Sequence, residues 1–330
     1  MPIKKFIIDH LDSGGVITNY YCSSNCRHCL YACGPRWKKI YMDELMAETS
    51  MKKIKSLGCN SIHVGGGESF LNLDGLKIVL GVAERLGLNI EYVETNSSWY
   101  QDKRSACKTL LSLKKRGLST LLISMSPFHN EYIPFYKVKG VLEACREAGV
   151  SPFPWMPGLY HEIDFFNEKS THSLSEYTNR YGEDYLKGLP SRYWIHLGGR
   201  ALQTFSKVLS LSPLENIINS NAKGCSELLN VSHFHIDLFG NYIPGLCSGL
   251  SINCKDIGVE IPEKEYPFLT TLYFEGIEGF LDIASRELGF RAVDAYLSKC
   301  HLCFDIRKYL TLERETESSE LQPKGIYKYL

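Results

Sequence analysis

Four segments of the sequence repeat one pattern at nearly constant spacing. Each is an amphipathic run that ends in a glycine and is followed by a short apolar stretch. The glycines, 29, 30 and 32 residues apart, are Gly58, Gly87, Gly117 and Gly149. Glycine readily takes the left-handed conformation just past a helix, and about 30 residues make one strand–helix unit. The spacing predicts helices that end at these glycines, and strands that begin near Ser61, Asn89, Thr120 and Ser151.

Two further strands are predicted around these repeats. One is Val16–Thr18, before the first repeat, and the other is Tyr193–Ile195. About six parallel strands that alternate with helices suit either a barrel-like or a doubly wound α/β fold. In both, right-handed crossovers bring the carboxyl ends of the strands to one face, where such folds keep their functional sites.

Beyond Gly198 the pattern changes. We expect a helical stretch over residues 202–219 and a β-hairpin over 231–243, because apolar and polar residues alternate there around a Gly-Asn turn. A second helical region is predicted over 277–297. The charged residues 313–323 lack a core pattern, which predicts a loosely attached tail.

Composition and charge exclude several classes of protein. Lysine plus arginine equals aspartate plus glutamate at 37 each, so the basic surface of a nucleic-acid-binding protein is not expected. No apolar run is long enough for a signal peptide or a membrane span, which predicts a cytoplasmic protein. In that compartment, the 12 cysteines indicate metal or redox chemistry rather than disulfides.

Three cysteines close together give the sharpest chemical signal. Cys22, Cys26 and Cys29 form a CxxxCxxC arrangement. Their thiolates can converge on one iron–sulfur cluster and leave its fourth iron without a protein ligand, whereas four cysteines are the usual set. A structural zinc site or incidental thiols are the alternatives, but zinc needs further ligands.

Together with Gly65-Gly66-Gly67-Glu68 at the end of the second predicted strand, this cysteine loop resembles the radical S-adenosylmethionine (SAM) enzymes over residues 15–202. The resemblance implies a partial (β/α)6 TIM-like barrel over residues 1–202. It also implies a [4Fe–4S] cluster whose open iron binds SAM. An electron, supplied by a flavodoxin- or ferredoxin-type reductant, cleaves SAM to a 5′-deoxyadenosyl radical that abstracts a hydrogen atom from substrate.

The same resemblance implies a set of SAM-binding residues: Gly66, Gly67, Glu68, Asn96, Ser124, His28 and Arg200. Glu68 would accept a hydrogen bond from the SAM ammonium group. His28 could stack on the adenine or be a solvated loop residue, and Ser124 could instead cap its strand. Arg200 could bind a carboxylate or anchor the C-terminal extension. Ser126 departs from the acid found in many relatives.

A second set of four cysteines lies in the C-terminal part of the chain: Cys225, Cys247, Cys300 and Cys303. Their order around a hairpin and a CxxC resembles the SPASM or twitch extension of this superfamily. This implies a small α+β domain over residues 203–312 with an auxiliary [4Fe–4S] cluster, followed by a tail over 313–330. Four thiolates could equally hold zinc. Cys254 could replace one ligand, and Cys33 has no assigned role.

These features predict a radical SAM enzyme whose substrate is a peptide, because relatives with such extensions often modify peptides. The alternatives are a dehydrogenase or carbon-skeleton enzyme acting on a small molecule, and a non-catalytic electron carrier or scaffold. His161, Glu162 and Asp164 follow the fifth strand and are candidates for substrate contact. The polar residues 162–189 could form a lid. No residue is assigned as a catalytic acid or base.

Overall fold

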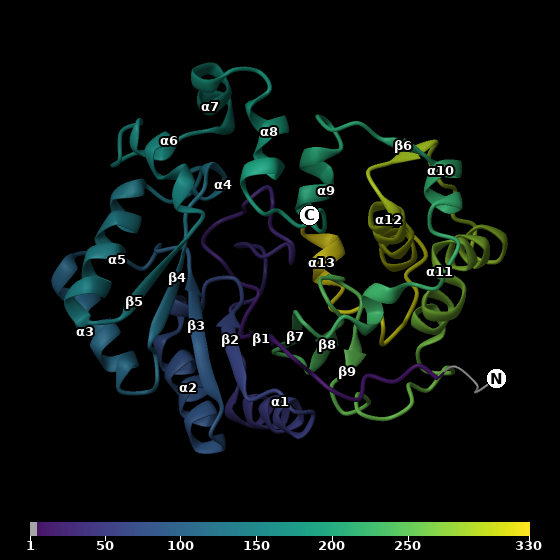
Figure 1. Ribbon diagram of the computed structural model, residues 1–330, viewed down its shortest axis with the longest axis horizontal. Helices are drawn as coiled ribbons and strands as arrows, with labels where there is room; N and C mark the ends of the chain where they lie inside the picture. Colours follow the sequence, from purple (N-terminus) through teal and green to yellow (C-terminus); the bar gives the residue numbers. More distant parts are fainter. Residues whose placement is uncertain (1–4) are drawn as a thin grey trace.

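The computed structural model describes residues 5–330, which are organised around one eight-stranded sheet (Figure 1). In spatial order its strands are β5 (Ser151–Trp155), β4 (Thr120–Ser124), β3 (Asn89–Thr95), β2 (Ser61–Gly65), β1 (Gly14–Ile17), β7 (Phe234–Asp237), β8 (Asn241–Ile243) and β9 (Ile252–Asn253). The first six are parallel, and β8 and β9 are antiparallel. The predicted α/β class is confirmed.

The four predicted repeats are present. Strands β2 to β5 begin at the predicted residues, and the helices that precede them are α1 (Glu44–Ser56), α2 (Leu73–Leu86), α3 (Lys103–Lys114) and α5 (Phe135–Ala148). The four repeat glycines have φ of 95°, 64°, 93° and 61°, the left-handed region that glycine adopts at little cost. Val64 of β2 and Val93 of β3 are fully buried and belong to the same hydrophobic core as Leu80 of α2.

The sixth parallel strand lies elsewhere than predicted. Residues 193–195 form no strand, and Trp194 is 56% exposed. The sixth strand is β7, which pairs with β1 on the side opposite β2. All four residues of β7 are buried, as expected for a strand inside a sheet. Among the described residues β5 pairs only with β4, so the sheet is open at this edge.

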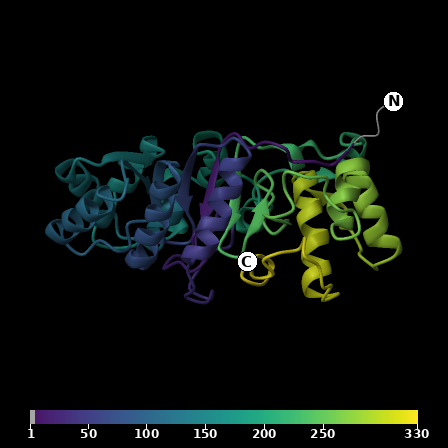
Figure 2. The ribbon, with the colours of Figure 1, turned by 90° about the horizontal axis from the view of Figure 1, so that it is seen from below.

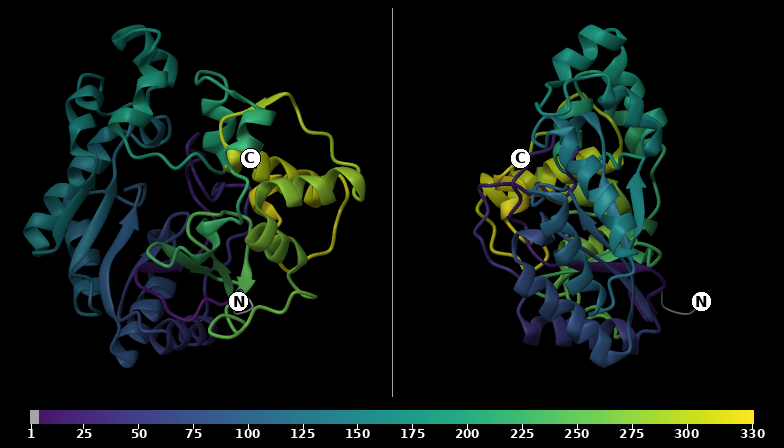
Figure 3. Two further views of the ribbon diagram at one scale, coloured as in Figure 1. Left: turned by 45° about the vertical axis from the view of Figure 1, so that its right-hand side comes forward. Right: turned by 90° about the vertical axis from the view of Figure 1, so that its left-hand side faces the viewer.

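The segment after β5 folds into three short helices, α6 (Tyr160–Asp164), α7 (Leu174–Tyr181) and α8 (Tyr185–Arg192). Figure 3 shows α7 and α8 projecting at one end of the molecule. The candidate acids of α6 have structural partners: Glu162 pairs with Arg192, and Asp164 pairs with Lys139. The lid role of this segment stays a prediction.

The C-terminal helices differ from the predicted ones. The stretch 202–219 is two helices, α9 (Arg200–Phe205) and α10 (Leu214–Asn219), separated by β6 (Ser212–Pro213). A proline at residue 213 cannot continue a helix ladder. The second region is α11 (Pro267–Arg286) and then β10 (Ala295–Tyr296), which pairs with β6. Gly289 follows α11 with φ of 80°, which ends the helix earlier than predicted.

Helix α12 (Lys299–Leu312) packs on α11, and both lie at the end of the molecule opposite α3 (Figure 2). Short helices α4 (Pro127–Asn130) and α13 (Gly325–Lys328) complete the fold. No helix within residues 5–330 is long and apolar enough to cross a membrane.

The predicted hairpin is confirmed as β7 and β8. Its turn is held by Asp237, whose carboxylate accepts the backbone N–H groups of Phe239 and Asn241 at 2.9 and 3.0 Å. Gly240 supplies the positive φ of 78° in the turn. Since β7 also pairs with β1, this hairpin extends the N-terminal sheet, and the two predicted domains share it. Their boundary at residue 202 stays a prediction.

The tail is attached, contrary to the prediction. Glu320 is fully buried, and its carboxylate accepts the backbone N–H groups of Phe268 and Leu269 at 2.9 and 2.7 Å, in the first turn of α11. Leu321 and Ile326 are also buried. The charged residues of the tail suggested exposure to solvent. A carboxylate is, however, also stabilised at the positive N-terminal end of a helix, and this is where Glu320 lies.

We expect Glu320→Ala to lower the free energy of unfolding by about 1–2 kcal/mol, because it leaves unpaired N–H groups in the first turn of a helix. Denaturant unfolding measures this. The matched control is Glu317→Ala, because the Glu317 side chain is 87% exposed in its pair with Lys324 and should change stability by less than about 0.5 kcal/mol. Equal effects of the two substitutions would contradict the anchoring role of Glu320.

Candidate active site

The carboxyl ends of β1 to β4 surround a cavity of about 180 Å³. It is lined by Cys22, Ser24, Cys26, His28, Cys29, Tyr31, Cys33, Gly66, Gly67, Glu94, Thr95, Asn96, Ser124, His129 and Arg200. All three cysteines of the N-terminal motif are in this set. So is every predicted SAM-binding residue except Glu68. The fold therefore brings residues from five separate segments into one site.

The cysteine loop is shaped by backbone hydrogen bonds. Cys22 donates its N–H to Gly34 O at 3.3 Å, and Cys29 donates to Cys26 O at 3.1 Å. All three motif cysteines are free thiols. Burial raises the pKa of Cys22 to about 12, so a metal ion would have to displace the thiol proton as it binds.

The glycines after β2 allow two stretches of backbone to meet. A Cβ on Gly67 would lie 2.1 Å from Tyr21 O, and one on Gly66 would lie 2.7 Å from Asn19 O. Gly67 donates its N–H to Asn19 O at 2.7 Å. The close approach that these glycines permit is therefore to the start of the cysteine loop, which they hold against the end of β2.

Glu68 lies beside the cavity rather than in its lining. Its side chain is buried and accepts three hydrogen bonds: from Asn96 N at 2.6 Å, Thr95 Oγ1 at 2.9 Å and Phe70 N at 3.2 Å. The carboxylate thus ties the end of β2 to the end of β3. Burial nevertheless raises the pKa of Glu68 to about 7. Its predicted contact with SAM stays a prediction.

Glu94 is the carboxylate that lines the cavity, and sequence reasoning assigned it no role. Its Oε2 lies over Gly65, 2.7 Å from where a Cβ would stand. No hydrogen bond to its side chain is found among residues 5–330. Burial, followed by the nearby Glu68 and Cys29, raises the pKa of Glu94 to about 7. A partly buried carboxylate without a hydrogen-bond partner is suited to bind a cationic group of a ligand.

In metal-free protein, Glu94→Gln should flatten the pH dependence of stability. The folded wild type keeps the Glu94 proton between the ordinary pKa of 4.5 and about 7, while the unfolded chain releases it. Wild-type stability therefore falls as pH rises through this window. Relative to wild type, the variant should gain up to about 3 kcal/mol between pH 4.5 and 7.5.

Urea unfolding at the two pH values measures this difference. Glu91→Gln, on the same strand but outside the cavity lining, is the matched control. A Glu94→Gln variant with the wild-type pH slope would show that this carboxylate is solvated.

Asn96 and Ser124 end neighbouring strands on the cavity. The Asn96 amide donates to Cys22 Sγ at 3.4 Å and to Ser24 Oγ at 3.3 Å. Hydrogen bonds to the sulfur ligands are one means by which proteins tune an iron–sulfur cluster. Ser124 faces the cavity, whereas Ser126 caps α4 and bonds His129 Nδ1 at 2.7 Å.

His28 lies among aromatic rings rather than in solvent. It stacks on Phe128 with centroids 4.6 Å apart, and meets His129 and Tyr193 edge-on. Its Nδ1 is buried without a hydrogen-bond partner in the described structure. An orphaned polar atom on a cavity wall fits a ligand that brings its own donor or acceptor, as an adenine would.

Arg200 clamps the cysteine loop. Its Nε donates to Cys26 O at 2.9 Å, Nη2 donates to Cys33 O, and Nη1 donates to Tyr329 O at 3.2 Å. The side chain is 5% exposed. Three of its five N–H donors thus go to backbone carbonyls. These contacts support the anchoring alternative, and a contact with SAM stays a prediction.

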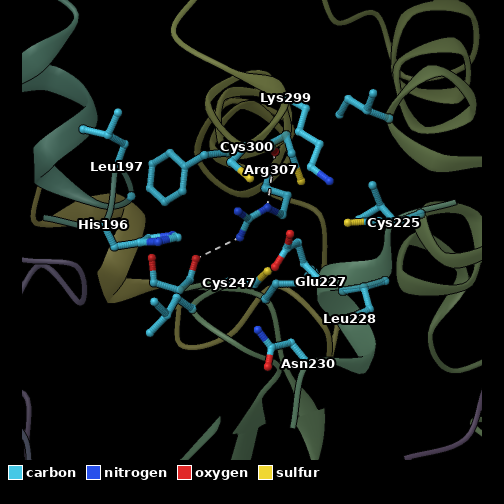
Figure 4. A pocket seen from close by; sticks show the side chains of 18 of the residues that line it. His196, Leu197, Cys225, Glu227, Leu228, Asn230, Cys247, Lys299, Cys300 and Arg307 are labelled. Carbon is cyan, nitrogen blue, oxygen red and sulfur yellow. Dashed lines mark hydrogen bonds between the residues drawn. The ribbon is translucent and has the colours of Figure 1, made fainter. Parts of the chain in front are cut away.

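The four C-terminal cysteines line a second cavity, of about 220 Å³. Cys300 and Cys303 lie one turn apart at the start of α12, and Cys225 and Cys247 reach the cavity from loops. Figure 4 shows the Cys225 and Cys247 side chains pointing into the space below Lys299. Burial raises the pKa of Cys225, Cys247 and Cys300, and the nearby Lys299 and Arg307 offset part of this rise. Four cysteines are the usual ligand set of an iron–sulfur cluster, and all four line this one cavity.

Two other cysteines are placed by the structure. Cys254 is buried outside the second cavity, against Gly240, so it does not join that ligand set. Cys33 lines the first cavity. Residues 196–198 line the second cavity, and Arg200 lines the first. This short segment therefore links the two sites.

Comparison with known proteins gives a family for the N-terminal part of the chain. Residues 16–164 match the family model of the Radical SAM superfamily. That stretch holds the cysteine loop and the glycine–glutamate turn, so the chain carries a radical SAM domain. A radical SAM domain implies a [4Fe–4S] cluster and SAM as cofactors and supports assignment as an enzyme.

No curated protein matches the chain. One similar solved structure is native anSMEcpe with bound AdoMet and Cp18Cys peptide. It is 13% identical with a TM-score of 0.43, covering 92% of this chain and 98% of that one. A likeness of this degree defines neither substrate nor reaction.

Proposed function

We propose that this chain is a radical SAM enzyme that abstracts a hydrogen atom from a peptide. The observation that carries the proposal is the convergence of Cys22, Cys26 and Cys29 with Gly66 and Gly67 on one cavity at the strand ends. A [4Fe–4S] cluster there would supply the electron that cleaves bound SAM to methionine and a 5′-deoxyadenosyl radical, which takes hydrogen from the substrate.

The residues around the cavity have separate tasks in this proposal. Glu94 offers its free carboxylate to the ammonium group of SAM, and Glu68 holds the two strand ends in register. The His28 ring offers a stacking face and the unpaired Nδ1. Asn96 donates to Cys22 Sγ, which orients that ligand. Arg200 fixes the loop carbonyls.

The second cysteine set supports a peptide substrate, because it resembles the auxiliary-cluster extensions found in peptide-modifying relatives. Cys225, Cys247, Cys300 and Cys303 would hold this cluster. Its proposed role is to take up an electron from the substrate radical or to position the substrate. If these four thiolates bound zinc instead, the site could not take up an electron, because zinc is redox-inactive. Its role would then be to position the substrate.

The proposal is tested by anaerobic reconstitution with iron and sulfide, reduction, and addition of SAM. Formation of 5′-deoxyadenosine and methionine is the expected result. Their absence from protein with an intact three-cysteine cluster would reject radical chemistry and leave an electron carrier or scaffold. Deuterium transfer into 5′-deoxyadenosine from labelled peptide pools, but not from labelled small-molecule pools, would support the peptide assignment, and the reverse would reject it.

A further inference from the structure

Three histidines lie close together beside the first cavity, and the proposed function assigns them no role. His63 lies on β2 and His235 on β7, with β1 between them, and Gly15 of β1 pairs with both. Paired residues on neighbouring strands project on the same face. A Cβ on Gly15 would lie 2.6 Å from His63 Nε2. Because Gly15 has no side chain, it leaves space on this face for the imidazoles of His63 and His235.

His233, just before β7, completes a compact triangle. His63 Nε2 and His235 Nε2 are 2.9 Å apart, and one ring nitrogen from each of the three histidines lies within 4.8 Å of the others. The ring centroids are 4.9, 5.1 and 5.5 Å apart. A tetrahedral metal ion about 2.0–2.1 Å from three imidazole nitrogens would hold the centroids about 5 Å apart.

Neighbouring groups fix the ring orientations. Tyr31 Oη lies 2.8 Å from His235 Nδ1, a contact that directs His235 Nε2 toward the other rings. Metal-bound histidines usually have such a partner on their second nitrogen. His63 stacks on Tyr92 with centroids 5.0 Å apart and an angle of 6°. Burial lowers the pKa of His63 to about 3, so its neutral ring has a lone pair to offer.

We propose that His63, His233 and His235 bind one divalent transition-metal ion, Zn²⁺ being the best match. Three neutral imidazoles leave one coordination position open in a tetrahedral site. Tyr31 lines the first cavity as well as contacting His235, so the ion would lie next to the reacting region. Its open position suits a carboxylate or hydroxyl group of the substrate. This proposal does not depend on SAM cleavage.

The test begins with full-length protein whose cysteine sites have been filled with iron and sulfide, so that they do not take up zinc. After equilibration with Zn²⁺ and dialysis, wild type should retain about one zinc per chain. Zinc X-ray absorption should show nitrogen or oxygen neighbours near about 2.0 Å and none of the sulfur expected near about 2.3 Å.

Three variants sharpen the test. The half-buried His233 is replaced as His233→Ala, which should lose the zinc. Tyr31→Phe keeps the ring but removes the hydroxyl, and should weaken zinc binding by about 10–100-fold. His10→Ala is the control, because His10 is exposed and pairs with Asp9, and it should bind zinc like wild type.

The proposal fails if wild type retains no zinc, if sulfur dominates the zinc shell, or if His233→Ala retains as much zinc as wild type. In each case the 2.9 Å contact between His63 and His235 is a hydrogen bond between two neutral rings. If His233→Ala does not fold, the wild-type spectrum alone decides. Formation of 5′-deoxyadenosine is measured separately, so either proposal can fail without the other.

Discussion

Replacing Cys22, Cys26 and Cys29 together with alanine is expected to abolish 5′-deoxyadenosine formation while the C-terminal cluster remains. The three thiols line one cavity, and the four C-terminal cysteines line another. Loss of one set should therefore leave the other intact. Iron per chain should fall from about eight to about four atoms, as expected for two cubes of four irons.

Iron and sulfide analysis, with the SAM cleavage assay on the same samples, measures both effects. Cys107→Ala is the matched control, because this buried cysteine lies on α3, outside both cavities. It should keep wild-type iron content and activity. Loss of all iron from a folded triple variant would count against a C-terminal cluster, and retained SAM cleavage would overturn the assignment of the three cysteines.

The repeats of the fold could be predicted because their signals are local. A glycine with positive φ ends each of the four helices, and the apolar stretch that follows each glycine begins a strand. The partners of distant segments carry no such local mark. Strand β7 pairs with β1, so that Asp237 lies opposite Ile17, and alternation in the sequence shows only that a strand exists. The same limit hid the contact of Glu320 with α11.

The candidate site shows the same division. Cysteine spacing and the glycine turn predicted five of the 15 cavity-lining residues, and the family resemblance that they carry added His28, Asn96, Ser124 and Arg200. The position of Glu94 on the cavity was not predicted, because it depends on Glu68 being turned toward Thr95 and Asn96, a contact between distant segments. The histidine triangle depends on Gly15 pairing with strands on both sides, which no single segment reveals.

Arg200→Ala should prevent assembly of the N-terminal cluster and destabilise the protein. The substitution removes the donors to Cys26 O and Cys33 O, at the two ends of the segment that holds Cys29. Cys26 O keeps the N–H of Cys29, but Cys33 O is left without a donor among the described residues, and a buried carbonyl left unpaired costs about 1–3 kcal/mol. Arg200→Lys should restore little, because an ammonium group is a point donor and cannot reproduce the fixed geometry of the guanidinium.

Iron content and the midpoint of denaturant unfolding measure the loss. Lys38→Ala is the control from just after the same loop: Lys38 is exposed, and a surface substitution of this kind usually changes stability by less than about 0.5 kcal/mol. If Arg200 instead binds only the carboxylate of SAM, Arg200→Ala will keep wild-type iron and stability and lose only SAM affinity. That result would move Arg200 from loop positioning to cofactor binding, and would leave backbone hydrogen bonds such as Cys22 N to Gly34 O as the determinants of the loop's shape.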